Sequence, residues 1–564
     1  QYIETCSHRG PDGYKVWWDP EHQMTLGHNL LSIMADPNLS TQPWKTPKGN
    51  ILVYNGEIFN YHELKAKYKG KGFAGITGCD TELLAWGLDE FGLNFLDELD
   101  SMHGFAYYDT LTKTLSLSRD HAGIKPLYYA NIEQGIVFGS EIKGMLDKVP
   151  NSRQLDKLAA SFQSRTGLNP LRQTLFSGIK KLLPGETIVY DLNSKKIIDT
   201  KRIYIKPNAN IKFDAEEFRS QLSKAVERCS IGKRKIGVFL SGGLDSSVVA
   251  YELGKIKKHV HTFTNKFSPE VGGDEDYNSD AKAAKALAEK ENFIHTEVEI
   301  TPKTFISSWD SSVYFGEQPV YTANSSMYCY TNKVLSENDI VVTIAGDMGD
   351  EILGGYTKYQ QILHKKYILK SWKDVLQLWL NRIKRPVTII DNIFDDATLL
   401  EEFGRCYSSE LWNPEDPTAS YMALDCVTQV PAEFFSRNDT YGMAYSMEGR
   451  FPLASKMFMQ YCLNIPTRYK IGSRDRDTKL LTKIAYKNLL PKEIIRKTKT
   501  GWTVPIGHWL KTNIDDELTN FYKGSMGQEN KIDTITLNAK VGKSLIPAWA
   551  YKSWKEKYKI KYLS

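Results

Sequence analysis

The segment SGGLDSS at residues 241–247 carries residue types that suit the binding of a polyphosphate. It follows an apolar run that predicts a strand over 235–240 and precedes a run that predicts a helix over 248–256. A strand, a glycine-containing turn and a helix start together present unpaired N–H groups to an anion. The two glycines let the backbone approach phosphate oxygens, the serine hydroxyls can donate further bonds, and Asp245 can hold a metal ion against the same charge. The residues expected in this site are Leu240, Ser241, Gly242, Gly243, Asp245, Ser246 and Ser247.

The alternative interpretation of this segment is a plain serine and glycine turn between a buried strand and a helix. The segment lacks the lysine that ends the GxxxxGK[ST] loop, so ordinary kinase or GTPase chemistry is not indicated.

A second loop, AGDMGDE at residues 345–351, follows a predicted strand over 340–345. Its carboxylates, from Asp347, Asp350 and Glu351, fall within five residues and repel one another unless they share a cation or a proton. The cluster, which also contains Gly346, is therefore expected to bind Mg²⁺ or to do acid–base work. An exposed acidic turn that caps a helix is the alternative.

The elements that position these loops differ between two parts of the chain. Residues 1–205 show short alternating strands with one helix near 81–90, which predicts an α+β or layered β domain. From residue 214 strands alternate with helices, which predicts a parallel sheet. Besides the elements given above, helices are predicted over 215–226 and 279–291 and strands over 260–266 and 294–300. Ligands bind beyond the carboxyl ends of such strands, where both loops fall. Residues beyond 356 are mainly helical in pattern, and residues 206–212 are the expected linker between domains at 1–205 and 214–564.

Composition narrows the class of protein. The 564 residues carry a net charge of +6 from 73 basic and 67 acidic residues, too balanced for a nucleic-acid binder. The seven cysteines form no CxxC pair, so neither a disulfide framework nor a zinc site is expected. No run is apolar and long enough to span a bilayer, and no signal-peptide pattern is present. A cytoplasmic protein with small-molecule partners, without nucleic acid or membrane, is the expectation.

The ordered motifs resemble those of the glutamine-dependent asparagine synthetase family along nearly the whole chain. In the second part the matching pieces are SGGLDSS at 241–247, AGDMGDEILGGY at 345–356, RND at 437–439, SMEGR at 446–450 and KTGW at 499–502. In the first part they are HRGPD at 8–12, NGEIFN at 55–60, TGCD at 77–80, SRDHAGIKP at 118–126 and LPG at 183–185.

The resemblance implies two domains and two sites. The first domain would have the layered αββα fold of N-terminal-nucleophile amidotransferases, in which an N-terminal cysteine releases ammonia from glutamine. The second would be an α/β parallel-sheet ATP-pyrophosphatase domain with a helical C-terminal part. There ATP and Mg²⁺ would activate the side-chain carboxylate of aspartate as an acyl-adenylate. Ammonia, arriving through an internal channel, would then give asparagine. The resemblance is also compatible with a homodimer.

The resemblance also implies roles for single residues. Lys499 would contact the phosphates, and Asp347 would lie near the attacking ammonia. Glu448, a third catalytic candidate, would belong to a helix that lines the pocket. Asp245 and Asp350 would hold Mg²⁺, and Gly346 would belong to the ATP site. The alternative for Lys499 is a solvated surface lysine. The alternative for Glu448 is a local salt bridge with Arg450. In the first domain the glutamine and oxyanion site would comprise Asn55, Gly56, Glu57 and Asp80, with Asp80 paired to the glutamine α-amine.

Several positions depart from the family pattern. The nucleophilic cysteine should precede HRGPD by some two dozen residues, but His8 has only seven residues ahead of it. Either a short N-terminal piece is missing or the glutaminase half is inactive, because Cys6 has no free amine to serve as base. Leu30 stands where the family arginine would clamp the glutamine carboxylate. Ala345 replaces a phosphate-contacting serine, and PLAS at 452–455 replaces PFLD, which is expected to remove a pocket-side carboxylate.

Three functions remain open at this point. The first is an asparagine synthetase that uses glutamine or ammonia. The second is a related amide- or lactam-forming synthetase, of the sugar-acid, β-lactam or lasso-peptide type, with an inactive glutaminase domain. The third is a catalytically silent scaffold. Retention of Asp245, Asp350 and Lys499 disfavours the scaffold, because crowded carboxylates are costly without a ligand.

Overall fold

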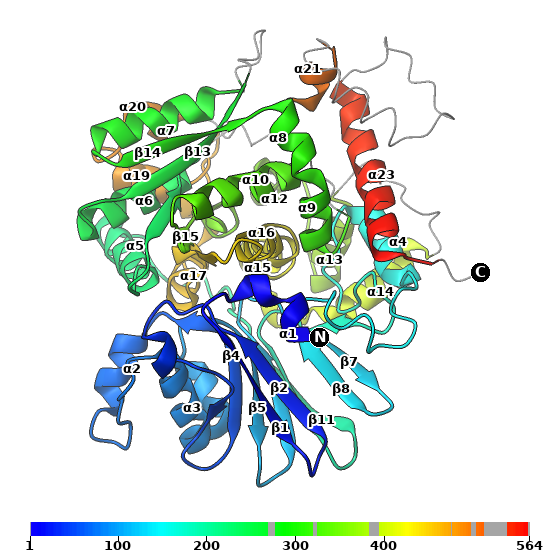
Figure 1. Ribbon diagram of the computed structural model, residues 1–564. Helices are drawn as coiled ribbons and strands as arrows, with labels where there is room; N and C mark the ends of the chain where they lie inside the picture. The colour runs from blue at the N-terminus through cyan, green and yellow to red at the C-terminus, as the bar shows by residue number, and fades with distance from the viewer. Residues whose placement is uncertain are drawn as a thin grey trace.

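The computed structural model describes residues 2–268, 277–319, 324–382, 394–474, 477–497, 504–511 and 539–561. Figure 1 shows the antiparallel strands of the first part of the chain below the helices and the parallel sheet of the second part. Lys499 lies outside the described residues.

The first domain is built on a six-stranded antiparallel sheet with the order β11-β10-β6-β5-β4-β3. Its strands are β3 (Trp44–Lys45), β4 (Ile51–Ile58), β5 (Ser101–Asp109), β6 (Thr114–Arg119), β10 (Glu186–Asp191) and β11 (Lys196–Arg202). A hairpin of β1 (Tyr14–Asp19) and β2 (Met24–Asn29) and a three-stranded sheet of β7 (Tyr128–Ile132), β8 (Gly135–Gly139) and β9 (Lys180–Lys181) complete the strands. The helices are α1 (Tyr2–Thr5), α2 (Tyr61–Tyr68), α3 (Asp80–Phe91) and α4 (Lys157–Thr166).

Alternation along β4 explains the layers of this domain. Leu52 and Tyr54 pack in one cluster with Leu83 and Leu84 of α3, whereas Ile51 and Val53 pack in another. That second cluster contains Leu26 of the hairpin and residues of β7. Successive side chains of a strand point to opposite faces, so helices cover one face of the six-stranded sheet and further strands cover the other. The layering agrees with the predicted N-terminal-nucleophile amidotransferase fold.

The second domain contains a five-stranded parallel sheet with the order β14-β13-β12-β15-β16. Its strands are β12 (Ile236–Phe239), β13 (His261–Phe267), β14 (Ile294–Ile300), β15 (Val342–Ile344) and β16 (Glu448–Arg450). The connecting helices are α5 (Ala215–Cys229), α6 (Leu244–Ile256) and α7 (Ser279–Lys290). The strands and helices predicted between 215 and 345 are thus confirmed, although α6 begins at Leu244 rather than at the predicted residue 248.

The strand order reverses between β12 and β15. From β12 the chain passes outward to β13 and β14, and it then returns to β15 on the other side of β12. Loops that follow two such strands diverge and leave a crevice at the carboxyl end of the sheet, where ligands bind in open α/β sheets. The loops at 241–243 and 345–348 follow these two strands.

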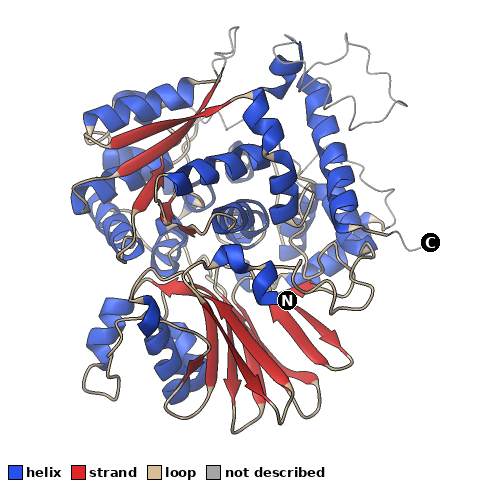
Figure 2. Ribbon diagram, viewed as in Figure 1, coloured by secondary structure: helices blue, strands red, loops and turns tan. Residues whose placement is uncertain are grey.

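The rest of the second domain is helical, as predicted, and Figure 2 shows this concentration of helices. The helices up to residue 406 are α8 (Pro302–Ser307), α9 (Trp309–Gly316), α10 (Asn324–Glu337), α11 (Gly349–Leu353), α12 (Thr357–Leu363), α13 (Trp372–Leu380) and α14 (Asp396–Cys406). Beyond it lie α15 (Pro417–Val427), a π-helix (Val430–Phe435), α16 (Ser436–Met443), α17 (Lys456–Leu463), α18 (Thr467–Lys470), α19 (Leu480–Tyr486), α20 (Lys492–Arg496), α21 (Ile506–Lys511) and α23 (Ala539–Tyr558).

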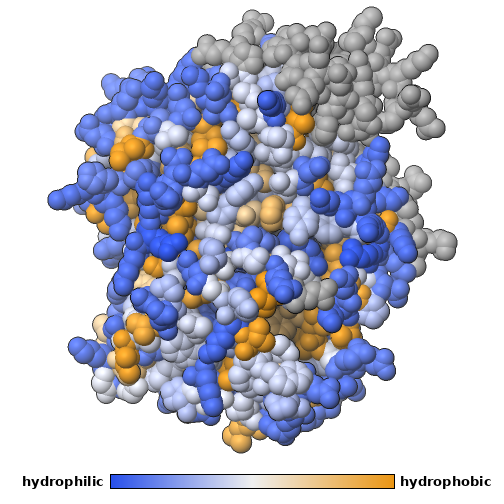
Figure 3. Space-filling view, in the orientation of Figure 1, coloured by the Kyte–Doolittle hydropathy of each residue, from blue (hydrophilic) through white to orange (hydrophobic). Residues whose placement is uncertain are grey.

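One hydrophobic cluster runs through both domains. It contains Phe59 and Met102 of the first domain together with Ile344 and Phe451 of the second. A shared core of this kind fixes the two domains against each other. The face seen in Figure 3 is mainly hydrophilic, with scattered apolar groups. Within the described residues, none of the helices is both apolar enough and long enough to cross a membrane.

Candidate functional site

The two predicted loops meet at one cavity of about 460 Å³, here named the acidic-loop cavity. Ser241, Asp245, Asp347 and Asp350 all line it. Glycine makes this meeting possible, since a Cβ on Gly346 would lie 2.7 Å from the Ser246 backbone nitrogen. The structure therefore brings together the polyphosphate loop and the acidic loop, as the sequence predicts.

The loop after β12 is held in shape by its own hydroxyl groups. The Ser241 backbone nitrogen donates to Ser246 Oγ (3.1 Å), and Ser247 Oγ donates to the Gly243 carbonyl (2.7 Å). Because α6 begins at Leu244, Asp245 and Ser246 stand in its first turn, where N–H groups have no partner within the helix. The hydroxyls thus shape the loop, and the helix start supplies donors for an anion.

Three of the expected loop residues stand behind the cavity surface. Leu240 and Ser247 are fully buried, and neither lines the cavity. Gly242 has a φ of 72°, and a Cβ there would lie 2.2 Å from the Asp280 carbonyl oxygen. Only glycine fits that position, so Gly242 serves the packing of the loop against α7.

Lys479 joins the two carboxylates predicted to bind metal. Its Nζ lies 2.5 Å from Asp245 Oδ2 and 2.6 Å from Asp350 Oδ1. Burial alone would lower the pKa of Lys479, but the two carboxylates hold that pKa above its ordinary value. The Lys479 ammonium group reaches both carboxylates, so the two are close enough to share a Mg²⁺ ion in its place. Mg²⁺ takes oxygen ligands from one or two carboxylates. Sequence reasoning missed Lys479, which stands far from both loops in the chain and belongs to none of the quoted motifs.

Asp347 lines the same cavity, and so do Arg437 and Glu433. Burial raises the pKa of Asp347, and the Arg437 guanidinium opposes that shift. Arg437 belongs to α16, directly after the π-helix that carries Glu433. A π-helical turn is rare and frequently occurs at functional sites. Sequence reasoning assigned no role to Glu433 and none to Arg437 beyond the RND match.

Arg437 and Glu433 also line a second cavity of about 200 Å³, the connecting cavity. Its other lining residues include Gln163, Leu168 and Arg382. The connecting cavity therefore adjoins the acidic-loop cavity at Arg437 and Glu433.

The predicted glutamine-site residues gather at another cavity, of about 140 Å³, the first-domain cavity. A Cβ on Gly56 would lie 2.1 Å from the Met102 carbonyl oxygen, so β4 and β5 approach closely only because residue 56 is glycine. Asn55 Nδ2 is buried and has no hydrogen-bond partner among the described residues, as expected of a donor that faces a ligand oxygen. Asp80 accepts from Tyr54 OH (2.9 Å) and the Ile58 backbone nitrogen (3.1 Å), and burial raises its pKa.

Cys6 and Leu30 line this first-domain cavity too. Burial, reinforced by Glu141, raises the pKa of the Cys6 thiol to about 12, so the thiolate required of a nucleophile is not formed near neutral pH. Leu30 is buried and supplies no charge for a glutamine carboxylate. Arg9, the one arginine or lysine among the described residues of this lining, is already paired with Glu141 and Asp439.

A chain of buried ion pairs crosses the contact between the domains, and we name it the charged seam. Glu57 Oε2 lies 2.6 Å from Arg450 Nη2, and Arg450 Nε lies 2.9 Å from Glu448 Oε1. Lys125 Nζ then joins Glu448 (3.4 Å) to Asp439 (3.6 Å). Glu448 stands on β16, not on the expected helix, and it lines the first-domain cavity, not the acidic-loop cavity.

The charged seam continues towards α9. Arg9 Nη1 lies 2.9 Å from Asp439 Oδ2 and 3.1 Å from Glu141 Oε1. Lys143 pairs with Glu141 and with Glu317. Every charge in the seam thus has an opposite partner, which is the condition for burying ions at tolerable cost.

The sequence 452–455 also lies at the contact between the domains. Ser455 Oγ donates to Asp100 Oδ2 (2.8 Å), and Ser455 caps the N-terminus of α17. It does not line the acidic-loop cavity. The expectation that this stretch had lost a pocket-side carboxylate is therefore wrong, because the stretch faces the first domain.

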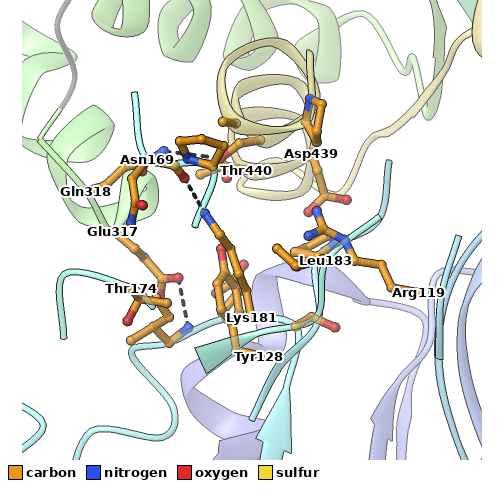
Figure 4. Close-up of a pocket in the computed structure, with 18 of the residues that line it drawn as sticks. Arg119, Tyr128, Asn169, Thr174, Lys181, Leu183, Glu317, Gln318, Asp439 and Thr440 are labelled. Atoms are coloured by element: carbon orange, nitrogen blue, oxygen red, sulfur yellow. Dashed lines mark hydrogen bonds between the residues drawn. The ribbon is translucent and has the colours of Figure 1, made fainter. Parts of the chain in front are cut away.

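Figure 4 shows a fourth cavity, of about 60 Å³, between the two domains, here named the interdomain cavity. Lys181 projects into it and donates to the Asn169 carbonyl. Burial lowers the pKa of Lys181 to about 7. This cavity shares Arg9 and Ser140 with the first-domain cavity and shares Asn169 and Thr440, among others, with the connecting cavity. The four cavities therefore follow one another from the glutamine-site residues to the acidic loop.

Comparison with known proteins agrees with this arrangement. The family model described as asparagine synthase matches residues 217–555, and the glutamine amidotransferase domain model matches residues 1–204. Glutamine-hydrolyzing asparagine synthetase 3 of Bacillus subtilis is 25% identical, with 90% of this chain and 86% of that protein covered. A putative asparagine synthetase of Mycobacterium tuberculosis is 26% identical, with 89% and 83% covered. The Zea mays enzyme is 30% identical, with 64% and 58% covered.

Proposed function

Because the chain belongs to the asparagine synthase family, we propose that it uses ATP to convert a carboxylate into an amide, with aspartate as acceptor and asparagine as product. The main support for the proposal is that the two loops meet at the point where the strand order reverses. Asp245 and Asp350 lie so close there that the ammonium group of Lys479 pairs with both. A silent scaffold would not need to keep these carboxylates together.

In the proposed reaction, an oxygen of the acceptor carboxylate attacks the α-phosphorus of ATP. The bond from that phosphorus to the oxygen bridging the β-phosphorus breaks, and pyrophosphate leaves. Ammonia then attacks the acyl carbon, the bond from this carbon to the AMP oxygen breaks, and the nitrogen loses a proton. Two easier steps replace a difficult one, because a carboxylate oxygen becomes a good leaving group only once it is joined to AMP.

The residues of the acidic-loop cavity suit these steps. The first turn of α6 would bind phosphate oxygens through its N–H groups. Asp245 and Asp350 would hold Mg²⁺, which when bound neutralises charge on the phosphates. Asp347, whose pKa is raised by burial, is suited to accept the proton that the attacking nitrogen loses.

Two sources of ammonia are compatible with the proposal. The succession of four cavities favours transfer from glutamine through the protein, and the unpartnered Asn55 Nδ2 favours a glutamine site. Leu30 in place of a carboxylate clamp favours free ammonium instead. Comparing asparagine formation from glutamine with that from ammonium chloride separates the two sources.

The activation step is tested with aspartate labelled with oxygen-18 in its side-chain carboxylate. We expect pyrophosphate and AMP as products, with one labelled oxygen in AMP, because the bond to AMP forms through a carboxylate oxygen. Formation of ADP, or unlabelled AMP in a reaction that makes asparagine, would refute the acyl-adenylate. Absence of ATP turnover with every carboxylate supplied would refute the proposed function as a whole.

A further inference from the structure

The connecting cavity is lined by two arginines with buried N–H groups that have no acceptor among the described residues. Arg437 forms no hydrogen bond and no ion pair through its guanidinium with any described residue, and its Nε is buried without an acceptor. Arg382 Nη1 is likewise buried without an acceptor within the described part of the chain. Buried charged donors without acceptors are costly, and they are rare in native structures unless a ligand or water completes them.

Arg437 is oriented by aromatic stacking. Its Cζ lies 4.0 Å from the centre of the Tyr328 ring and 5.2 Å from that of Phe434. Stacking occupies the faces of a guanidinium and leaves its edge, which carries the N–H groups, for a ligand. The edge of a guanidinium matches a carboxylate, which it can bind through two parallel hydrogen bonds.

Glu433 supplies the opposite charge at the same place. Its carboxylate accepts one long hydrogen bond from Gln429 Nε2 (3.5 Å) and forms no ion pair with a described lysine, arginine or histidine. With Arg437 it lines both the connecting cavity and the acidic-loop cavity. Glu433 and Arg437 thus stand without an ion pair among the described residues, at the boundary of the acidic-loop cavity that Asp347 also lines, and Arg382 lines the connecting cavity alone.

The arrangement differs from that of two lysines around the acidic-loop cavity, Lys479 and Lys497. Lys479 is paired with Asp245 and Asp350, and Lys497 lies 2.5 Å from Asp280. Arg382 lines the connecting cavity but not the acidic-loop cavity, so a ligand that reaches both arginines extends away from the phosphate loop. The cavity of about 200 Å³ exceeds the space of a single water many times over, so a ligand group of several atoms fits.

From these contacts we infer that the connecting cavity and its boundary bind the α-amino-acid head group of the acceptor. Arg437 and Arg382 bind its α-carboxylate, Glu433 binds its α-ammonium group, and the side-chain carboxylate then points to Asp347 and the phosphate loop. This inference rests on the proposed function and deepens it, since it assigns residues to the two groups that distinguish aspartate from a simple carboxylic acid.

Aspartate and two acceptors that each lack one of its charged groups test the inference in the full chain. Succinate lacks the ammonium group of aspartate, and 3-aminopropanoate lacks its α-carboxylate. We expect ATP–pyrophosphate exchange to favour aspartate over each of them by about 50-fold or more in kcat/KM, because each loses one charged contact.

Two variants assign the contacts. Arg437→Met should lower kcat/KM for aspartate and succinate by about 50-fold or more and leave that for 3-aminopropanoate unchanged. Glu433→Gln should lower kcat/KM for aspartate and for 3-aminopropanoate and leave kcat/KM for succinate unchanged. Arg437→Lys should restore part of the loss. Arg468, which is exposed and stacks on Tyr469 at 5.1 Å, provides the matched control Arg468→Met, which should change none of these values.

The outcomes separate this inference from the function on which it rests. Exchange by the unaltered chain, together with the same acceptor preferences in Arg437→Met and Glu433→Gln, would overturn the head-group site and leave carboxylate activation standing. A rise in the KM for ATP in Arg437→Met, with acceptor preference unchanged, would reassign Arg437 to the nucleotide and also overturn the inference. No exchange with any acid would remove the proposed function itself. Equal thermal stability of the variants confirms that each is folded.

Discussion

The charged seam and the ligand cavities use the same residue types in opposite ways. In the seam, each arginine and lysine meets a carboxylate of the chain itself, as Arg450 meets Glu57 and Glu448. At the connecting cavity, Arg437 and Arg382 stand beside Glu433 without forming an ion pair with it. The difference teaches that pairing, more than burial, separates charges that hold domains together from charges that await a ligand.

The largest effect should come from the carboxylates of the acidic-loop cavity. Asp245→Asn should lower pyrophosphate release by about 1,000-fold or more, because a neutral amide neither binds Mg²⁺ as well nor offsets Lys479. The measurement is pyrophosphate release with aspartate, at equal thermal stability. Asp147→Asn, at an exposed ion pair with Arg153, is the matched control and should keep full activity. Activity of Asp245→Asn within tenfold of the unaltered chain would contradict the site.

A smaller loss is expected when the two loops are pushed apart. Gly346→Ala places a Cβ 2.7 Å from the Ser246 nitrogen and 2.8 Å from the Asp245 carbonyl carbon, and both of these are backbone atoms that cannot swing away. We expect about a 100-fold loss of pyrophosphate release, on the scale expected when a catalytic site is misplaced by about 1 Å. Gly404→Ala meets only a Leu376 methyl carbon at 3.7 Å and should keep full activity. Equal activity of the two variants would show that the loops do not need this contact.

In the charged seam the effect should fall on stability. Arg450→Met leaves Glu57 and Glu448 buried without their shared partner and should lower the free energy of unfolding by about 3–5 kcal/mol. Arg405→Met, which removes an exposed pair with Glu401, should cost less than about 1 kcal/mol. Chemical denaturation measures both values. A cost for Arg450→Met as small as that of the control would mean that the seam does not hold the domains together.

The mildest effect concerns titration inside the first domain. His103 lies between Ser101 Oγ (2.9 Å) and Ser118 Oγ (3.3 Å), and burial lowers its pKa from 6.5 to about 4. Below pH 6.5 the unfolded chain binds a proton that the folded chain refuses, so this histidine makes stability fall as pH falls towards 4. Its contribution at pH 5 should be about 2 kcal/mol less favourable than at pH 7.

Denaturation of the unaltered chain and of His103→Gln at pH 7 and pH 5 measures this contribution. The difference in unfolding free energy between the two pH values should be smaller in the variant. An identical pH dependence in the two proteins would place the titration at other histidines.

Sequence patterns predicted the elements better than the contacts between them. The strand predicted at 294–300 is β14, and the helix predicted at 279–291 is α7, because apolar periodicity is a local property. The helix start at Leu244 was placed too late, since the apolar run begins only after the polar residues that form its first turn.

The structure brings together part of the site residues predicted from a loop and a strand end, and their roles stay predictions. Asp245, Asp347 and Asp350 line one cavity, and Asn55 and Asp80 line another. Glu448 and the stretch 452–455 were expected at the pocket, but both lie at the contact with the first domain. The sequence does not reveal which side of β16 and of the turn after it faces that domain. The role predicted for Lys499 stays a prediction, since that residue lies outside the described part of the chain.

By itself the sequence determined the local geometry: a strand, a glycine turn and a helix start for phosphate, and a glycine at 346 where no side chain fits. The tertiary structure alone decided which charges meet. Lys479 reaches Asp245 and Asp350, and Arg437 reaches the cavity that Asp347 also lines, only because elements distant in sequence converge at the end of the sheet. The physical reason is that Coulomb and hydrogen-bond energies depend on distances in space, which no spacing along the chain fixes once the residues lie on separate elements.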